Sequence, residues 1–250
     1  MIKNLNIINF KLNPNKKIYL QLIFSASLSI LIFFLSLHEQ VWSNFWGSIK
    51  IPPNIVPFSD FKAHLLFYNC DVIGIDINSQ ECIFIPDGNA KINSHPKIWI
   101  YLFDILNLQN KLIYSFTILF LLTVYFYIIC RLYAEFAIFE NRVVLLILFF
   151  STTNFILLER LATDLIIFIL AYVALNLRSK IFQAVFIFTG FILKYFPIFL
   201  ALIFIEKKRF LFLFTFIVIL FVYFFYLNNF VSTNNNMIEM SLPIAYGART

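Results

Sequence analysis

The chain has 250 residues, of which 61% are hydrophobic, 20% are aromatic and only 13% are charged. Soluble domains are about 45–50% apolar and about 25% charged, so this composition indicates an integral membrane protein. The net charge of +6 does not indicate nucleic-acid binding, because the basic residues stand at the edges of apolar runs rather than in a patch with stacking aromatic residues. The chain has only five glycines, and this scarcity argues against a helical transporter, since such proteins use small residues to pack their helices and Gly and Pro to break them.

The N-terminal region combines a basic segment with a long apolar run. Residues 1–17 contain four lysines and no acidic residue, and the run at 18–37 is long enough to cross a hydrocarbon core of about 30 Å. The basic flank predicts that 1–17 is cytoplasmic and that 18–37 is the first transmembrane helix. A cleaved signal peptide is the alternative. The length of the run and the lack of a small-residue cleavage site favour a retained helix.

Residues 38–110 form the only long polar stretch. It holds four lysines against seven acidic residues, a net charge of −3, together with all three tryptophans and all three histidines. We expect this segment to be an extracytoplasmic loop that carries amphipathic helices. The stretch "FSDFKAHLLFYN" predicts one such helix, with Phe61, Leu65 and Tyr68 on one side. The stretch "HPKIWIYLFDIL" predicts a second, returning to the membrane with Trp99 and Tyr101 at headgroup level.

The rest of the chain is predicted to be a transmembrane bundle over 111–228. Apolar runs predict spans at about 111–130, 143–158, 164–177 and 210–228. The tail at 229–250 is polar and is expected to be extracytoplasmic, with a further span after it, so we expect the chain to be incomplete. The predicted fold class is an all-α, polytopic membrane protein of the cell inner (plasma) membrane.

The apolar segment 181–205 has a lysine at its centre. If it crossed the membrane once, the basic stretch "EKKR" at 206–209 would lie outside, against the positive-inside tendency. We therefore predict a re-entrant hairpin with Lys194, Tyr195 and Pro197 at its tip, which is tolerated only where protein or a water-filled cavity surrounds it. The alternative is a single tilted helix whose lysine extends to the interface.

Further charged residues fall between two apolar runs in "NFILLERLATDLIIF". Glu159 and Arg160 are expected in a short outer turn, and Asp164 at the start of the next helix, where an acid suits the helix dipole. One interpretation is an exposed ion pair at a helix start. The other is a charged lining of a cavity that opens outward, because ionisable residues within membrane segments are functional candidates.

Three stretches resemble the GT-C superfamily of membrane glycosyltransferases, and more narrowly the bacterial polyprenyl-phosphate-mannose-dependent mannosyltransferases. "SDFKAHLLFYNCDVIGID" resembles the start of that family's first periplasmic loop, and "SHPKIWIYLFDIL" resembles its return to the membrane. "ERLATDLIIFIL" with "LKYFPIFLALIFIEKKRF" resembles its paired acidic and Lys-x-x-Pro segments. The chain departs from the family at Leu161 and Ala162, where Gly-Asn is frequent, and at His95, where Tyr is frequent. The resemblance implies a GT-C-like helical bundle.

The resemblance also implies a reaction: transfer of a mannose-like sugar from a polyprenyl-phosphate donor to a hydroxyl of a glycan or lipid acceptor. By resemblance Asp60 is the general base; the alternative is a helix N-cap. His64, one helical turn on, would orient Asp60 or contact substrate, or be an ordinary interfacial histidine. A leaving phosphate needs cationic support, for which Lys194 and then Arg160 are the candidates. The remaining substrate-binding candidates are Glu159, Asp164 and Tyr195.

Several questions stay open from the sequence. No metal or cofactor beyond the lipid-linked donor is expected, because the acidic residues are scattered. Cys70 and Cys82 either form a disulfide in an oxidising compartment or remain thiols. A transporter or lipid flippase is the alternative function, and a non-catalytic or truncated membrane subunit is the third.

Overall fold

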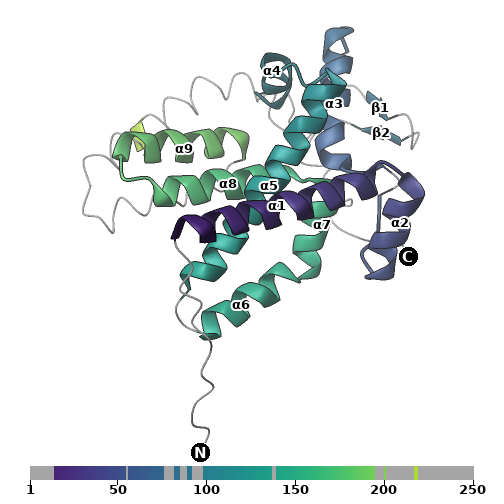
Figure 1. The fold of residues 1–250 in the computed structure, drawn as a ribbon. Helices are drawn as coiled ribbons and strands as arrows, with labels where there is room; N and C mark the ends of the chain where they lie inside the picture. Colours follow the sequence, from purple (N-terminus) through teal and green to yellow (C-terminus); the bar gives the residue numbers. More distant parts are fainter. Residues whose placement is uncertain are drawn as a thin grey trace, which may run out of the picture.

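The computed structural model describes residues 14–54, 56–75, 82–84, 89–91, 98–136, 139–194, 200 and 217–218. Their regular secondary structure is helical apart from one antiparallel pair of three-residue strands, β1 (Cys82–Phe84) and β2 (Asn89–Lys91), which the sequence did not predict. The helices, drawn in Figure 1, are α1 (Pro14–Ser36), α2 (Glu39–Ser48), α3 (Ser59–Val72), α4 (Ile98–Ile105), α5 (Lys111–Glu135), α6 (Phe139–Phe149), α7 (Thr152–Arg160), α8 (Thr163–Asn176) and α9 (Lys180–Leu193).

Helices α1 and α5 are the two described helices that are long and apolar enough to cross a membrane by themselves. They pack against each other, and the small side chains of Ser25 and Ser29 are fully buried. Gln21 donates from Nε2 to the backbone oxygen of Cys130 at 3.3 Å, which links the two helices. Small and amide side chains are the usual means by which membrane helices approach closely and hydrogen-bond to one another.

The expected span at 143–158 is not one helix. Helices α6 and α7 meet at an angle of 49°, as a broken span or a re-entrant loop does. The break has a local cause, because the hydroxyl of Ser151 accepts a hydrogen bond from the backbone N–H of Asn154 and so caps a new helix. Serine favours helix caps over helix interiors because its side chain competes for backbone hydrogen bonds.

The expected span at 164–177 corresponds to α8, a helix of the predicted length but a short one for a membrane span. Helix α8 has 14 residues, about 21 Å at 1.5 Å per residue, so it does not cross a 30 Å core by itself. Helix α9 has the same length and packs beside α8 (Figure 1). Tyr195, Pro197, the expected span 210–228 and the tail 229–250 lie outside the described residues, apart from 217–218, so the hairpin stays a prediction.

The segment between α1 and α5 carries the two predicted helices, α3 and α4, and an additional helix, α2, that the sequence did not predict. We use the name loop end for these three helices together with α7 and the ends of α8 and α9 that adjoin them. There α3 packs against α4 and α7, and α4 contacts α9. The buried face of α3 includes Phe61, His64 and Phe67, so Leu65 and Tyr68 lie beside that face rather than on it. Trp42 of α2 packs edge-on against Phe58 with a ring-centroid distance of 5.0 Å.

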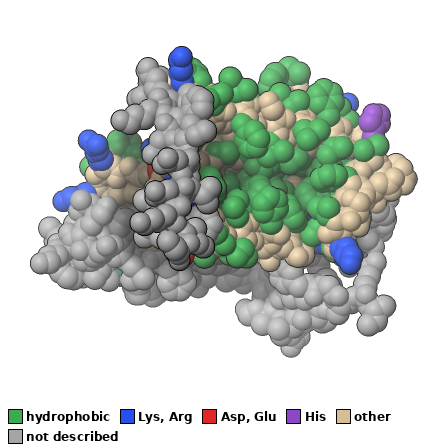
Figure 2. All heavy atoms as spheres, turned by 60° about the horizontal axis from the view of Figure 1, so that its bottom comes forward, with side chains coloured by type: hydrophobic (Ala, Val, Ile, Leu, Met, Phe, Trp, Pro, Cys, Tyr) green, Lys and Arg blue, Asp and Glu red, His purple; other side chains and the backbone are tan. Residues whose placement is uncertain are grey.

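Much of the surface is apolar. Large side chains such as Phe24 of α1, Phe116 of α5, Ile147 of α6 and Phe182 of α9 are exposed. Figure 2 shows hydrophobic side chains gathered over one face, with lysine and arginine at its margins. Soluble proteins rarely expose continuous apolar patches of this extent. The apolar surface and the two long helices indicate a membrane protein.

Candidate functional site

Asp60 lies in the first turn of α3 at the loop end. It is not the N-cap, because that position is occupied by Phe58, whose φ of 56° is left-handed. The preceding Ser59 is tied to the 51–54 segment through its Oγ, which accepts from Nδ2 of Asn54 at 2.5 Å. A carboxylate in the first turn of a helix is stabilised by the helix dipole.

Glu159 is fully buried at the end of α7 and joins three segments of the loop end. Its Oε1 accepts hydrogen bonds from the backbone N–H of Asn54 at 2.9 Å and from Nε1 of Trp42 at 3.3 Å. Its backbone oxygen accepts from the N–H of Phe58 at 3.2 Å. Asp60 lies within electrostatic reach of this carboxylate. Glu159 therefore fixes the segment that leads into α3 and Asp60.

Two sequence-based predictions are wrong for Glu159: it does not lie in an outer turn, and the interpretation of an exposed ion pair fails because its side chain is buried. Both Glu159 and Arg160 belong to α7, and Nε of Arg160 lies 3.7 Å from the buried Oε2 of Glu159. The side chain of Arg160 keeps 34% of its surface exposed. Leu161 follows the last helical residue as the C-cap; it is left-handed, with φ 47°, and it is buried, with 1% of its surface exposed. This is the conformation that glycine adopts without strain.

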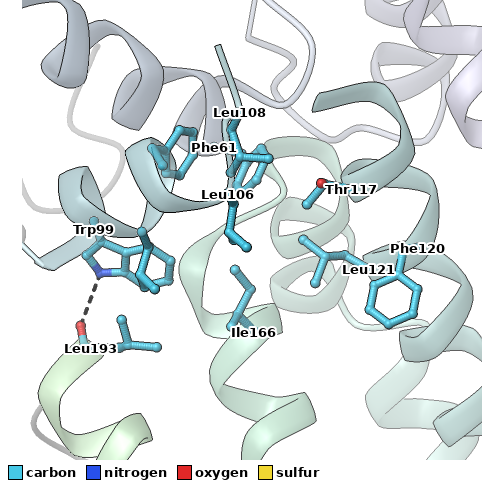
Figure 3. Close-up of a pocket in the computed structure, with 11 residues that line it drawn as sticks. Phe61, Trp99, Leu106, Leu108, Thr117, Phe120, Leu121, Ile166 and Leu193 are labelled. Atoms are coloured by element: carbon cyan, nitrogen blue, oxygen red, sulfur yellow. Dashed lines mark hydrogen bonds between the residues drawn. The ribbon is translucent and has the colours of Figure 1, made fainter. Parts of the chain in front are cut away.

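His64 lies one turn after Asp60, as predicted, but it does not face solvent. Its ring is buried and stacks on Trp99 of α4 with a centroid distance of 4.9 Å. Trp99 is itself buried against protein side chains, and its predicted level in the membrane stays a prediction. Its Nε1 donates to the backbone oxygen of Leu193 at 3.3 Å, the contact drawn as a dashed line in Figure 3. His64 and Trp99 thereby connect α3 with the end of α9.

Lys194 follows α9 directly and forms an ion pair with Asp164 in the first turn of α8. The Nζ–Oδ1 distance is 2.5 Å, and the side chains are 34% and 38% exposed. The backbone N–H of Lys194 also donates to the backbone oxygen of Gly190. The sequence singled out both residues but did not pair them.

An apolar cavity of about 330 Å³ lies between α3, α4, α5, α8 and α9. Figure 3 shows side chains from these elements facing one another around it. Phe61, beside Asp60, and Leu193, beside Lys194, both line it, and so do the exposed side chains of Leu106 and Phe120. Because exposed residues form part of the wall, the cavity opens to the surface. Among the described residues that line it, Thr117 is the one with a hydroxyl group.

A hydrogen bond joins α3 to α4, two of the helices that form the wall of the cavity. The phenol of Tyr68 donates to Oδ1 of Asp104 at 3.0 Å. The hydrogen bond to this carboxylate raises the pKa of Tyr68 above its ordinary value of 10.0. Cys70, two residues on, is disulfide-bonded, and the side chain of Cys82 lies outside the described residues.

Sequence reasoning missed the partners of the buried carboxylate. Trp42 and Asn54 precede Glu159 by more than one hundred positions, and the only signal in the sequence is that both lie in the aromatic, polar segment after the first helix. No cluster of three or more His, Cys, Asp or Glu side chains at metal-binding distance occurs within the described ranges. Tyr195 falls outside those ranges.

Comparisons of the chain with protein-family models, with curated protein sequences and with solved structures found no significant match. A functional assignment therefore depends on the geometry of the loop end.

Proposed function

We propose that the protein is a membrane glycosyltransferase that moves a sugar from a polyprenyl-phosphate donor to an acceptor hydroxyl at the extracytoplasmic face. The observation that carries this proposal is the apolar cavity whose walls include the neighbours of Asp60 and Lys194. A cavity lined almost entirely by hydrocarbon and aromatic groups suits an isoprenoid chain. Its exposed wall residues, Leu106 and Phe120, would let that chain enter from the lipid.

The proposed reaction uses three charged groups of the loop end. The acceptor oxygen attacks the anomeric carbon while its proton passes to the carboxylate of Asp60. The bond between the anomeric carbon and the phosphate oxygen breaks, and the phosphate leaves with the electron pair. Lys194 and Arg160 are the cations that would stabilise the departing phosphate, since both keep about a third of their side-chain surface exposed.

The other candidate residues have supporting roles in this proposal. Glu159 holds the entrance of α3 through its contacts to Trp42 and Asn54 and does not touch substrate. His64 shapes the cavity wall by stacking on Trp99. Asp164 is the counter-ion of Lys194.

A reconstituted assay tests the proposal and separates it from a lipid flippase. Purified full-length chain in proteoliposomes is given polyprenyl-phosphate mannose with a radiolabelled sugar, and glycan and lipid acceptors are added outside. We expect label in the acceptor and release of free polyprenyl phosphate, but none from a nucleotide-linked mannose. Movement of the labelled donor between leaflets without sugar transfer would contradict the proposal and favour a flippase.

A further inference from the structure

The ion pair between Asp164 and Lys194 occupies the position where the proposed function needs a free cation. Lys194 follows Leu193, which lines the apolar cavity and whose carbonyl is held by Trp99. A lipid chain in that cavity would bring its phosphate toward this end of α9. In the structure, however, the ammonium group of Lys194 already contacts a carboxylate oxygen at 2.5 Å.

This pair is placed so that an external anion can replace the carboxylate. Both side chains are about one-third exposed, so the pair is solvated and contributes little to folding. Helices α8 and α9 are also packed along their lengths, and the end of α9 has a second tie through Trp99. A phosphate offers several strong acceptor oxygens to the same ammonium group, and the released carboxylate would remain in water at the start of a helix, where its charge is favoured.

We infer that Asp164 is an internal competitor for the anionic headgroup: it pairs with Lys194 in the ligand-free protein and gives way when a lipid phosphate binds. This inference rests on the proposed function, in which Lys194 receives that phosphate. The carboxylate of Asp164 would prevent weakly binding anions from reaching the ammonium group of Lys194. Only an anion attached to a chain that fills the cavity would displace this carboxylate.

The competitor role makes a prediction opposite to that of a positioning role. If Asp164 competes, Asp164→Asn removes the competing carboxylate and tightens lipid-phosphate binding by about two- to fivefold, the effect of removing one solvated ion pair. If Asp164 instead positions Lys194, the same variant weakens binding. Lys194→Gln is expected to weaken binding about threefold or more in either case.

Native mass spectrometry of the full chain in detergent measures these affinities with undecaprenyl phosphate as the probe and neutral undecaprenol as its control. Glu135→Gln is the matched variant, because Glu135 forms an exposed pair with Arg131 at 2.6 Å, and it should bind like the wild type. Inorganic phosphate at the same concentration should not displace the lipid. Displacement by inorganic phosphate would overturn the inference, because the cavity would then add nothing to recognition.

The outcomes separate this inference from the proposed function. If Lys194→Gln binds undecaprenyl phosphate as tightly as the wild type, the phosphate site of the proposed function is wrong and the inference falls with it. If Lys194→Gln weakens binding while Asp164→Asn weakens it or leaves it unchanged, only the inference is wrong.

A measurement on the wild-type protein tests the same inference even if the Asp164 and Lys194 variants fail to fold. Carbodiimide labelling of Asp164, read by peptide mass spectrometry, should increase with undecaprenyl phosphate and not with undecaprenol. Unchanged labelling under saturating undecaprenyl phosphate would overturn the inference.

Discussion

Glu159 and Asp164 are five positions apart in the sequence, yet their surroundings in the folded protein differ sharply. Glu159 is fully buried, accepts hydrogen bonds from Trp42 and Asn54, and lies beside Arg160. Asp164 is 38% exposed, and its hydrogen-bond partner in the described structure is Lys194. The left-handed Leu161 stands between them and ends α7, so the chain changes direction there.

The difference separates two uses of charge at the loop end. A buried carboxylate that satisfies donors from distant segments cannot leave them without a large cost, so Glu159 is suited to holding structure. A solvated pair contributes little and exchanges readily, so Asp164 and Lys194 are suited to meeting a ligand. The following predictions test this contrast, beginning with the largest effect.

Removing the two carboxylates should change stability by very different amounts. Glu159→Ala leaves the N–H groups of Trp42 and Asn54 unpaired and should lower the free energy of unfolding by about 3–5 kcal/mol. Asp164→Ala removes a solvated pair and should cost about 1 kcal/mol or less. Thermal denaturation of the purified variants in detergent measures both. Equal shifts in the thermal unfolding midpoints of the two variants would contradict the different roles given to Glu159 and Asp164.

The left-handed residue between the carboxylates can be tested by paired substitutions. Leu161→Ala should cost about 2–5 kcal/mol, because it removes a buried side chain. Leu161→Gly loses the same side chain but relieves the left-handed strain, so it should be about 1 kcal/mol less destabilising than the alanine variant. Leu165, equally buried but within α8, is the control, where glycine should instead be about 1 kcal/mol worse than alanine. The same order at both positions would argue against strain at Leu161.

Loss of the hydrogen bond between Trp99 and Leu193, next to Lys194, should have a smaller effect on stability. Trp99→Phe keeps an aromatic ring against His64 but removes the donor to the carbonyl of Leu193, at a cost of about 1 kcal/mol for the hydrogen bond alone. Trp46→Phe is the control, because Nε1 of Trp46 makes no hydrogen bond within the described residues. Thermal midpoints should fall further for the Trp99 variant. A larger fall for Trp46→Phe would show that the Leu193 contact is unimportant.

The smallest expected effect is a titration outside the membrane segments. The hydrogen bond to Asp104 raises the pKa of Tyr68, so the protonated phenol is favoured in the folded protein. Any stability from this contact is therefore present below the ordinary tyrosine pKa and is lost as the pH rises through the raised value. Asp104→Asn should lower the pKa of Tyr68, followed by fluorine NMR of fluorotyrosine, whereas Asp71→Asn should not. An unchanged pKa in the Asp104 variant would contradict this contact.

The sequence predicted features that depend on local pattern. The apolar runs at 18–37 and 111–130 correspond to α1 and α5, because run length alone decides whether a helix can span a membrane. The helices at 58–69 and 95–106 correspond to α3 and α4, although the buried face of α3 is shifted toward His64. Local periodicity locates a helix but leaves its buried face uncertain when apolar residues surround it.

The features that escaped prediction are non-local or depend on a single cap. The partners of Glu159 lie more than one hundred residues away, and nothing in the neighbourhood of Glu159 indicates them. The pairing of Asp164 with Lys194 depends on the packing of α8 against α9, a contact that neither predicted topology specified. The break between α6 and α7 follows from the cap at Ser151 within an otherwise apolar run.

The central claim is that the first turn of α3 carries the base for sugar transfer. Its most direct test compares initial rates of mannose transfer from polyprenyl-phosphate mannose by Asp60→Asn and Asp71→Asn, two substitutions in the same helix. Asp71 is exposed near the other end of α3 and serves as the matched control. We predict a loss of about 10²-fold or more for the Asp60 variant, the typical contribution of a general base, and wild-type rates for the Asp71 variant. Transfer by Asp60→Asn at the wild-type rate would contradict this account.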